Sequence, residues 1–134
     1  MSRANITLVQ SLYAAFGRGE IWPIVAAVAP DVNWEVVGRK TDYPILGKYK
    51  GPQGVQGFFQ QVGALQQSDE FAPGEFSASG DKVFVTGHYA WTIKKTGRKV
   101  AADWIHVFTI KDGKVTAFRE FTDTAQFAEA NRAA

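Results

Sequence analysis

The stretch best suited to chemistry is the last third of the chain, residues 98–124, which places one histidine and one glutamate among aromatic neighbours. These are His106 and Glu120, fourteen residues apart. A carboxyl group among aromatic rings loses hydration, and a nearby imidazole can hydrogen-bond it and share its proton. Such a pair can remove a proton next to a ketone and return it elsewhere, which serves enolisation, aldol ring closure or dehydration. This chemistry needs neither a metal nor a cofactor, and we expect none.

Whether the two side chains meet depends on the Lys-Asp-Gly-Lys loop that joins the last two predicted strands. A two-residue type I′ turn at Asp-Gly would pair Ile110 with Val115. His106 would then lie opposite Arg119, and Glu120 would point to the other face of the sheet, so no site would form. Counting apolar residues on each face favours this register.

A three-residue loop, with Gly113 left-handed in a G1 bulge, would shift the pairing by one residue and place Ile110 opposite Lys114. Glu120 would then lie opposite Trp104 and diagonal to the histidine, on the same face and within reach. The opposite face would be too apolar for water, so this register predicts a homodimer through that face. The residue pattern leaves both registers open.

Composition limits the remaining functions. The 134 residues predict one domain, residues 1–134, and 13% are aromatic, which suits a core or an apolar cavity. The absence of cysteine excludes disulfides and thiol nucleophiles, and two histidines without ligand spacing argue against a metal site. The densest basic run, residues 94–99, lacks an aromatic platform for nucleic acid. Apolar runs are too short for a bilayer, so we expect a soluble, cytoplasmic protein that binds neither nucleic acid nor membrane.

The periodicity of apolar residues predicts the elements that position the pair. Helical spacing indicates helices over residues 6–16 with Asn5 as cap, over 21–29, and over 51–67, where Gly51-Pro52 opens the helix. Alternating patterns and turn residues predict strands over residues 31–37, 46–49, 70–79, 82–93, 99–110 and 115–122. Asp123 is expected to cap a last helix over 124–130. Helices followed by an antiparallel meander imply an α+β fold with a curved sheet packed on helices.

At this level of detail the sequence resembles a known family. The segments that carry the resemblance are Leu-Tyr-Ala-Ala-Phe at 12–16, Asp-Val-Asn-Trp at 31–34, Gly-His-Tyr at 87–89 and the stretch 104–123. They are similar, in order and spacing, to the SnoaL-like group of the nuclear transport factor 2-like superfamily, over roughly residues 5–128. The resemblance implies a cone-shaped, cystatin-like barrel in which a strongly curved, mostly antiparallel sheet packs on three N-terminal helices around an apolar pocket. It also implies dimers through the sheet's outer face, and it favours the register that joins His106 to Glu120.

The resemblance carries over unevenly to catalytic positions. Ketosteroid isomerases have a tyrosine and two aspartates where this sequence has Leu12, Val36 and His106, so steroid isomerase activity is disfavoured. The carboxylate–arginine–carboxylate set of limonene epoxide hydrolases is missing from the matching strand. Polyketide cyclases of the SnoaL type are similar in having a histidine and, fourteen residues later, an acidic residue that acts as acid/base. The resemblance therefore implies Glu120 as general base and acid, with His106 as its orienting partner.

We predict a substrate pocket for a hydrophobic cyclic carbonyl compound, with Tyr13 and Trp104 as hydrogen-bond donors to the carbonyl. The predicted lining is Tyr13, Trp34, Phe58, Tyr89, Trp104, Phe108 and Phe118. In the alternative interpretation the two ionisable residues form a buried polar pair that only fixes strand register, and the protein is a non-catalytic ligand-binding or accessory protein. An enclosed pocket of several hundred Å³ would favour the enzyme, and an aromatic-filled cone the alternative. His88, Asp103 and Arg119 are expected at the surface.

Overall fold

The computed structural model describes residues 2–132. Within that range the chain forms, in order, α1 (Ser2–Gly17), α2 (Trp22–Ala27), β1 (Val28–Val36), β2 (Gly47–Lys50), α3 (Gly51–Leu65), β3 (Gln66–Ser79), β4 (Lys82–Ile93), β5 (Lys99–Lys111), β6 (Lys114–Thr122) and α4 (Thr124–Asn131). The order of helices and strands predicted from the sequence is confirmed.

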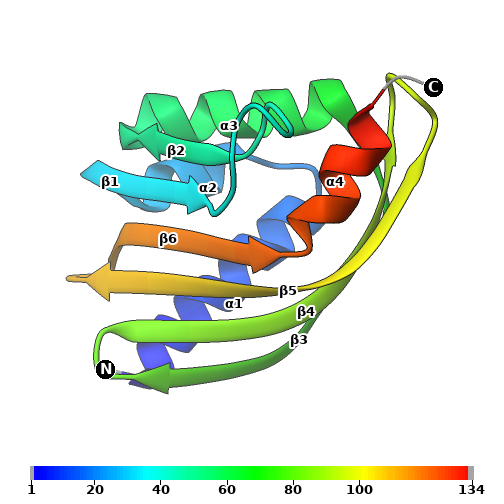
Figure 1. Ribbon diagram of the computed structural model, residues 1–134. Coiled ribbons are helices and arrows are strands. Elements are labelled where there is room, and N and C mark those ends of the chain that lie inside the picture. Colours follow the sequence, from blue (N-terminus) through cyan, green and yellow to red (C-terminus); the bar gives the residue numbers. More distant parts are fainter. Residues whose placement is uncertain (1, 133–134) are drawn as a thin grey trace.

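The strands form one sheet in the order β2-β1-β6-β5-β4-β3. All neighbouring strands are antiparallel except β1 and β6, which are parallel. Figure 1 shows the sheet curving around α1 and α3, with the long strands β4 and β5 bending at the end where α4 lies. The α+β class and the curved, mostly antiparallel sheet on N-terminal helices are therefore confirmed.

The helices that cover the concave face present buried apolar side chains at helical spacing. Val9 and Leu12 of α1 are buried, and α3 buries Val55 and Phe58 in the same way. Gly51 opens α3 with a φ of +73°, a left-handed conformation in which glycine is strongly favoured, and the proline after it suits the first helical turn. Among residues 2–132, no helix has the length and apolarity that a bilayer span requires.

Several predicted element ends were wrong. Asn5 is not a cap, because α1 already begins at Ser2. The second helix stops at Ala27, and β1 begins at Val28 and runs through Pro30, at a point where its pairing with β6 shifts register and a proline can be accommodated. Asp123 precedes α4 but makes no side-chain capping hydrogen bond. Its carboxylate accepts a hydrogen bond from the side chain of Gln126 instead.

The β5–β6 hairpin combines a tight turn with a bulge. Lys111 pairs with Lys114, and the two residues between them both have positive φ, +52° and +75°, as a type I′ turn requires. Ile110 then pairs with Val115, but the next pair along is Thr109 with Ala117. The residue between them on β6, Thr116, is therefore an extra residue, which reverses the faces of every later side chain.

Both predicted registers were consequently wrong. The turn is the two-residue type, yet His106 pairs directly with Glu120 and lies opposite neither Arg119 nor Phe118. Both side chains point into the concave side, where His106 is 5% exposed. On the outer face of the same strands, Ile105 is 45% exposed and Phe121 is 38% exposed.

Candidate active site

Four side chains from three regions of the chain form a continuous hydrogen-bonded network, which we call the polar network. The Oη atom of Tyr13 on α1 lies 2.6 Å from Nδ1 of His106 on β5. Nε2 of His106 lies 2.8 Å from Oε1 of Glu120 on β6. The hydroxyl of Tyr89 on β4 donates to the other carboxylate oxygen, Oε2, at 2.8 Å. The helix and the bulged hairpin are both needed to assemble it.

Burial determines where the protons of this network lie. Desolvation raises the pKa of both Tyr13 and Tyr89 strongly, and the negative charge of Glu120 raises it further, so both phenols keep their protons. Among residues 2–132, the hydrogen-bond partner of the Tyr13 hydroxyl is Nδ1 of His106, and a phenol that donates there requires a nitrogen without a proton. In that arrangement the imidazole proton lies on Nε2, which donates to Glu120. The carboxylate is held by two donors.

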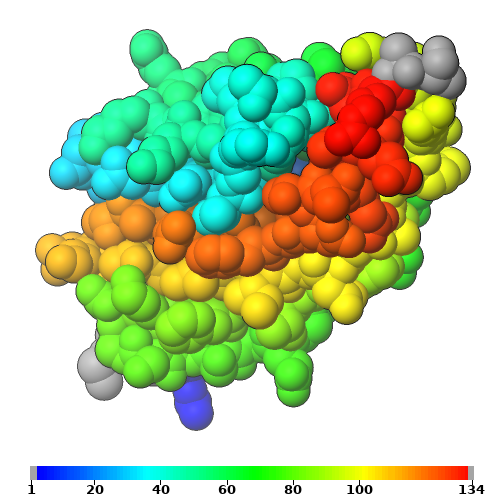
Figure 2. All heavy atoms as spheres, in the orientation of Figure 1, coloured from blue at the N-terminus to red at the C-terminus, as the bar shows by residue number. Residues whose placement is uncertain are grey.

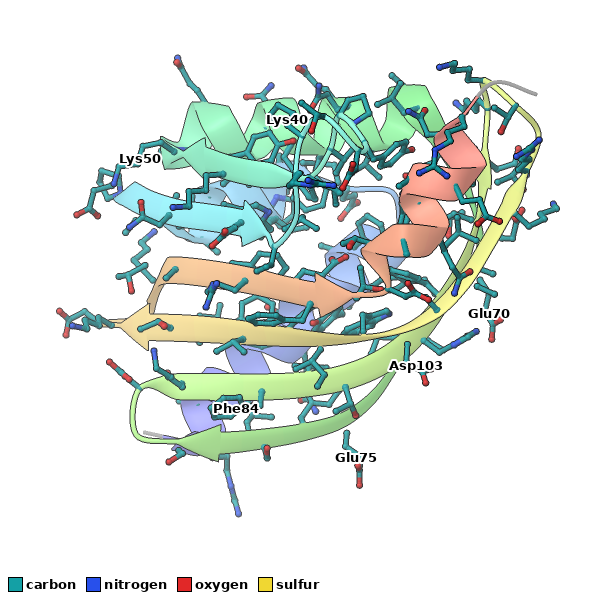
Figure 3. The ribbon with its side chains drawn as sticks, viewed as in Figure 1. Lys40, Lys50, Glu70, Glu75, Phe84 and Asp103 are labelled. Atoms are coloured by element: carbon teal, nitrogen blue, oxygen red, sulfur yellow. The ribbon has the colours of Figure 1, made fainter. Side chains whose placement is uncertain are left out.

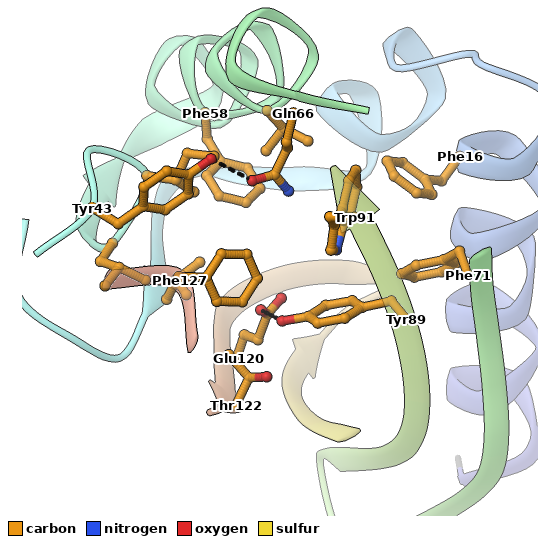
Figure 4. Close-up of a pocket in the computed structure, with 14 residues that line it drawn as sticks. Phe16, Tyr43, Phe58, Gln66, Phe71, Tyr89, Trp91, Glu120, Thr122 and Phe127 are labelled. Carbon is orange, nitrogen blue, oxygen red and sulfur yellow. Dashed lines mark hydrogen bonds between the residues drawn. The ribbon is translucent and has the colours of Figure 1, made fainter. Parts of the chain in front are cut away.

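The carboxylate of Glu120 reaches one of two small cavities inside the cone. This cavity, the polar lobe, has a volume of about 60 Å³. Figure 4 shows Glu120 on one side of it and Gln66 on the other. Its polar and amphipathic lining consists of Tyr43, Gln66, Tyr89, Trp91, Glu120 and Thr122, and its apolar lining includes Val36, Leu46 and Phe127.

The second cavity, the apolar lobe, also has a volume of about 60 Å³. His106 and Tyr13 line it from the other side of the polar network, and the rest of its wall is aromatic or aliphatic, consisting of Leu12, Phe16, Ile24, Trp34, Phe58, Phe59, Phe71, Phe108 and Phe118. Three phenylalanines, Phe16, Phe58 and Phe71, line both lobes. The interior is thus divided, and each lobe is smaller than the several hundred Å³ expected of one enclosed pocket.

A larger groove, which we call the entrance groove, lies at the surface beside the polar lobe. It has a volume of about 600 Å³ and lies between the end of α1, α3 and the start of β3. The groove shares five lining residues with the polar lobe, namely Phe16, Val62, Gln66, Phe71 and Trp91. The groove and the polar lobe are therefore adjacent, with these five side chains between them.

The structure places eight of the nine predicted site residues on a cavity wall. Tyr13, Trp34, Phe108, Phe118 and His106 line the apolar lobe, Tyr89 and Glu120 line the polar lobe, and Phe58 lines both. Trp104 does not fit the prediction, because it lines none of the cavities described here. Its indole stacks on the imidazole of His106 at 3.9 Å between ring centroids. It occupies the space beside Gly87, where an added Cβ would collide with the ring.

Sequence reasoning missed several cavity residues. Gln66 was placed near the end of the third helix, whereas it is the first residue of β3 and is 94% buried. Tyr43 lies in the loop before β2, and its hydroxyl donates to Oε1 of Gln66 at 2.7 Å. A glutamine following a helical apolar pattern has no local signal for burial. Its burial becomes apparent only in the folded chain, where it lines both the groove and the polar lobe.

The surface residues behave as predicted. His88 pairs with Asp103 at 2.9 Å, and these side chains are 42% and 91% exposed. Arg119 points outward and pairs with Glu35 on β1 at 3.1 Å. Within residues 2–132, no group of three or more His, Asp or Glu side chains is arranged to hold a metal ion.

The model of the SnoaL-like domain family matches residues 9–118 of this chain. An NTF2-like protein from Burkholderia xenovorans LB400 is 30% identical, with a TM-score of 0.86 and 98% of each chain covered. TerC, crystallised with polyporic acid, is also 30% identical, with a TM-score of 0.82 and coverage of 95% of this chain and 97% of TerC. A protein with a cystatin-like fold from Xanthomonas campestris is 22% identical, with a TM-score of 0.80 and coverage of 96% and 98%. Among functionally curated proteins, none matches the sequence.

Proposed function

The chain belongs to the SnoaL-like family, and we propose that within this fold it is a cofactor-independent general acid/base enzyme of the isomerase, cyclase or dehydratase type. Its substrate would be a hydrophobic cyclic carbonyl compound. The observation that carries the proposal is the polar network, in which a carboxylate on a side chain that is 13% exposed is held by two donors while it lines a cavity. A fixed, desolvated base beside an apolar ligand is what proton abstraction from carbon requires.

The network assigns a role to each member. Glu120 takes the proton from the carbon next to the carbonyl, the C–H bond breaks, and the electrons move onto the carbonyl oxygen as an enolate. The carboxylic acid so formed returns the proton to a different atom of the substrate. His106 and Tyr89 hold the carboxylate through one oxygen each and thereby fix its direction. Tyr13 fixes the tautomer of His106.

The relatives support a small-molecule function for the cone. TerC, at 30% identity, has been crystallised with polyporic acid. The groove of about 600 Å³ beside the polar lobe offers a ligand of that kind a path to the carboxylate in this protein. An aromatic ligand would contact the phenylalanines that line both lobes, Phe16, Phe58 and Phe71.

Enolisation can be tested without knowing the natural substrate. We expect the wild-type protein to exchange the α-hydrogens of 1-tetralone or 2-tetralone for deuterium in D₂O faster than buffer does, as measured by proton NMR. Glu120→Gln should lower the protein-catalysed rate by about 100-fold or more, the usual contribution of a general base. The amide keeps the size of the side chain and can still accept the proton of His106, so folding should be retained.

The matched control is Glu75→Gln, the same substitution at an exposed position on β3. Figure 3 shows the Glu75 side chain pointing away from the sheet, at its edge. This variant should exchange at the wild-type rate. Wild-type exchange by a folded Glu120→Gln variant, checked by circular dichroism, would sink the assignment of Glu120.

A second candidate function is that of a non-catalytic accessory or small-ligand-binding protein, and the small size of the two lobes favours it over the enzyme. Each lobe measures about 60 Å³, far less than a bicyclic substrate fills. In that case the polar network only holds the strands in register. Exchange of the tetralones no faster than in buffer, whether or not they bind, is the expected outcome for this candidate.

A further inference from the structure

The polar lobe contains hydrogen-bond donors that the polar network does not use. Gln66 and Trp91 are 6% and 5% exposed, and both line the polar lobe and the entrance groove. Buried N–H groups are nearly always paired, because an unpaired one costs about 1–3 kcal/mol. Donors left unpaired on the wall of a cavity indicate where a ligand supplies the acceptor.

The amide of Gln66 is held in a fixed orientation by Tyr43. Burial raises the pKa of Tyr43 to about 12, so its hydroxyl keeps the proton and donates it to Oε1 of Gln66 at 2.7 Å. The amide oxygen therefore faces Tyr43, and the NH₂ group faces the other way. Figure 4 shows the amide nitrogen on the side turned from Tyr43 toward Trp91. Nε2 of Gln66 has no hydrogen-bond partner among residues 2–132, and unlike Nε1 of Trp91 it is not fully enclosed.

The second donor is the indole of Trp91 on β4. Its Nε1 is fully buried and has no hydrogen-bond partner within the described part of the chain. The ring lies edge-on to Tyr89, with 5.8 Å between ring centroids, and it separates the entrance groove from the polar lobe. Figure 4 shows the indole nitrogen at the end of the ring nearer Tyr89, on the pocket side.

We propose that Nε2 of Gln66 and Nε1 of Trp91 form a donor pair that binds an oxygen of an uncharged carbonyl ligand in the polar lobe. The assignment rests on the proposed function for the reaction itself, and it adds the substrate class and the residues that select it. The oxygen is held at the Gln66 side of the lobe, and the carbon next to the carbonyl is turned toward Glu120 on the opposite side (Figure 4). Because the lobe measures only about 60 Å³, the rest of a bicyclic framework lies in the groove that Gln66 and Trp91 also line.

The charges around the lobe select a neutral ligand over an anion. No lysine or arginine is among the residues that line the polar lobe, and the carboxylate of Glu120 is part of its wall. An acidic ligand would meet that carboxylate without a counter-charge, in a place where burial makes the repulsion strong. A ketone oxygen accepts two N–H donors at no such cost.

The test compares 1-tetralone with tetralin, which has the same bicyclic frame without the oxygen. In wild-type protein, a ¹H–¹⁵N titration should shift the side-chain amide signals of Gln66 and the indole signal of Trp91 with 1-tetralone and much less with tetralin. The preference for the ketone is measured by the dissociation constant of tetralin divided by that of 1-tetralone. This ratio should fall by about three- to tenfold in Gln66→Met and in Trp91→Phe, the effect of losing one hydrogen bond.

The matched control is Trp22→Phe, the same substitution at a position on α2 that is 73% exposed and lines neither lobe. This variant should change the dissociation constants of 1-tetralone and tetralin by the same factor, so their ratio should stay at the wild-type value. A wild-type protein that binds 1-tetralone no better than tetralin, including one that binds neither, overturns the donor pair, and so do two folded variants that keep the wild-type ratio.

The outcome is separate from that of the acid/base proposal. A ketone preference that depends on Gln66 and Trp91, without deuterium exchange in the wild type, supports the donor pair and contradicts acid/base catalysis. Exchange that depends on Glu120, without a ketone preference, supports acid/base catalysis and contradicts the donor pair.

Discussion

Tyr13 has an influence on the site that its position in the first helix does not suggest. Its hydroxyl is the hydrogen-bond partner of Nδ1 of His106, at 2.6 Å, and burial keeps that hydroxyl protonated. When the protonated phenol donates to Nδ1, the imidazole carries its proton on the other nitrogen. The direction of the hydrogen bond to Glu120 is therefore set from a different element of secondary structure.

Tyr13→Phe should release this constraint. We expect the α-exchange rate of the tetralones to fall by about tenfold, which corresponds to the loss of one hydrogen bond of about 1.4 kcal/mol. The ¹⁵N shifts of His106 should change from those of a single Nε2-protonated form to those of a mixture of tautomers. A purely structural role for Tyr13 would leave the imidazole shifts in place while stability falls.

Tyr49→Phe is the control for this substitution, because Tyr49 is a half-buried tyrosine that lines neither lobe and donates to the carbonyl of Ile45. It should leave the exchange rate and the imidazole shifts unchanged. Wild-type exchange and wild-type tautomer in folded Tyr13→Phe would contradict the proposed role.

At the scale of elements, the bulge at Thr116 decides which side chains of β6 face the cone. Deleting Thr116 should remove the bulge and leave a regular ladder, because Ala117 still pairs with Thr109 and Glu120 with His106. The polar network should therefore persist in a folded deletion variant, as checked by circular dichroism. We expect its deuterium exchange of the tetralones to stay within about threefold of the wild-type rate, a change smaller than the loss of one hydrogen bond.

Thr116→Val tests the same position without changing its length. The side chain of Thr116 donates only to the carbonyl of Thr109, at 3.3 Å, so this variant should lose about 1 kcal/mol or less and keep the register. Loss of exchange in a folded deletion variant, with exchange retained in Thr116→Val, would show that the register of β6 is not the one that the pairing predicts.

The same bulge explains why the fold could be predicted from the sequence and the facing of Glu120 could not. Apolar spacing, Gly51-Pro52 and the Asp-Gly turn are local signals, and they suffice for element order and class. The face of a strand residue depends on parity, so one extra residue reverses it. A threonine favours strands whether it is bulged or paired, so nothing at Thr116 predicts the irregularity. The burial of Gln66 was not predicted, because it results from contacts with elements that are distant in the sequence.

At the scale of the whole molecule, the outer face of the sheet carries two of the three large apolar side chains that are exposed among residues 2–132. Figure 2 shows β4, β5 and β6 forming that surface with no helix over most of it. Ile105 and Phe121 are exposed there, and Arg119 lies over the Phe121 ring at 4.9 Å. Figure 3 shows Phe84 on the same side of β4. We propose that a second copy of this chain covers the face, which would make the protein a homodimer.

Ile105→Lys should convert such a dimer to a monomer, because it places a charge in the middle of the buried face. Light scattering coupled to size-exclusion chromatography measures the mass directly. Trp22→Lys is the control, since Trp22 is 73% exposed on α2, away from the sheet's outer face. A wild-type monomer, or an Ile105→Lys dimer, would count against the proposal.

The three phenylalanines shared by the two lobes have a consequence for how the protein can change over evolution. Phe16, Phe58 and Phe71 line both cavities and belong to α1, α3 and β3, and none of them is a member of the polar network. Phenylalanine and leucine codons differ by a single nucleotide. One point mutation can therefore widen the interior and admit bulkier compounds while the reacting groups stay in place, so ligand range and reaction type can diverge independently in this protein.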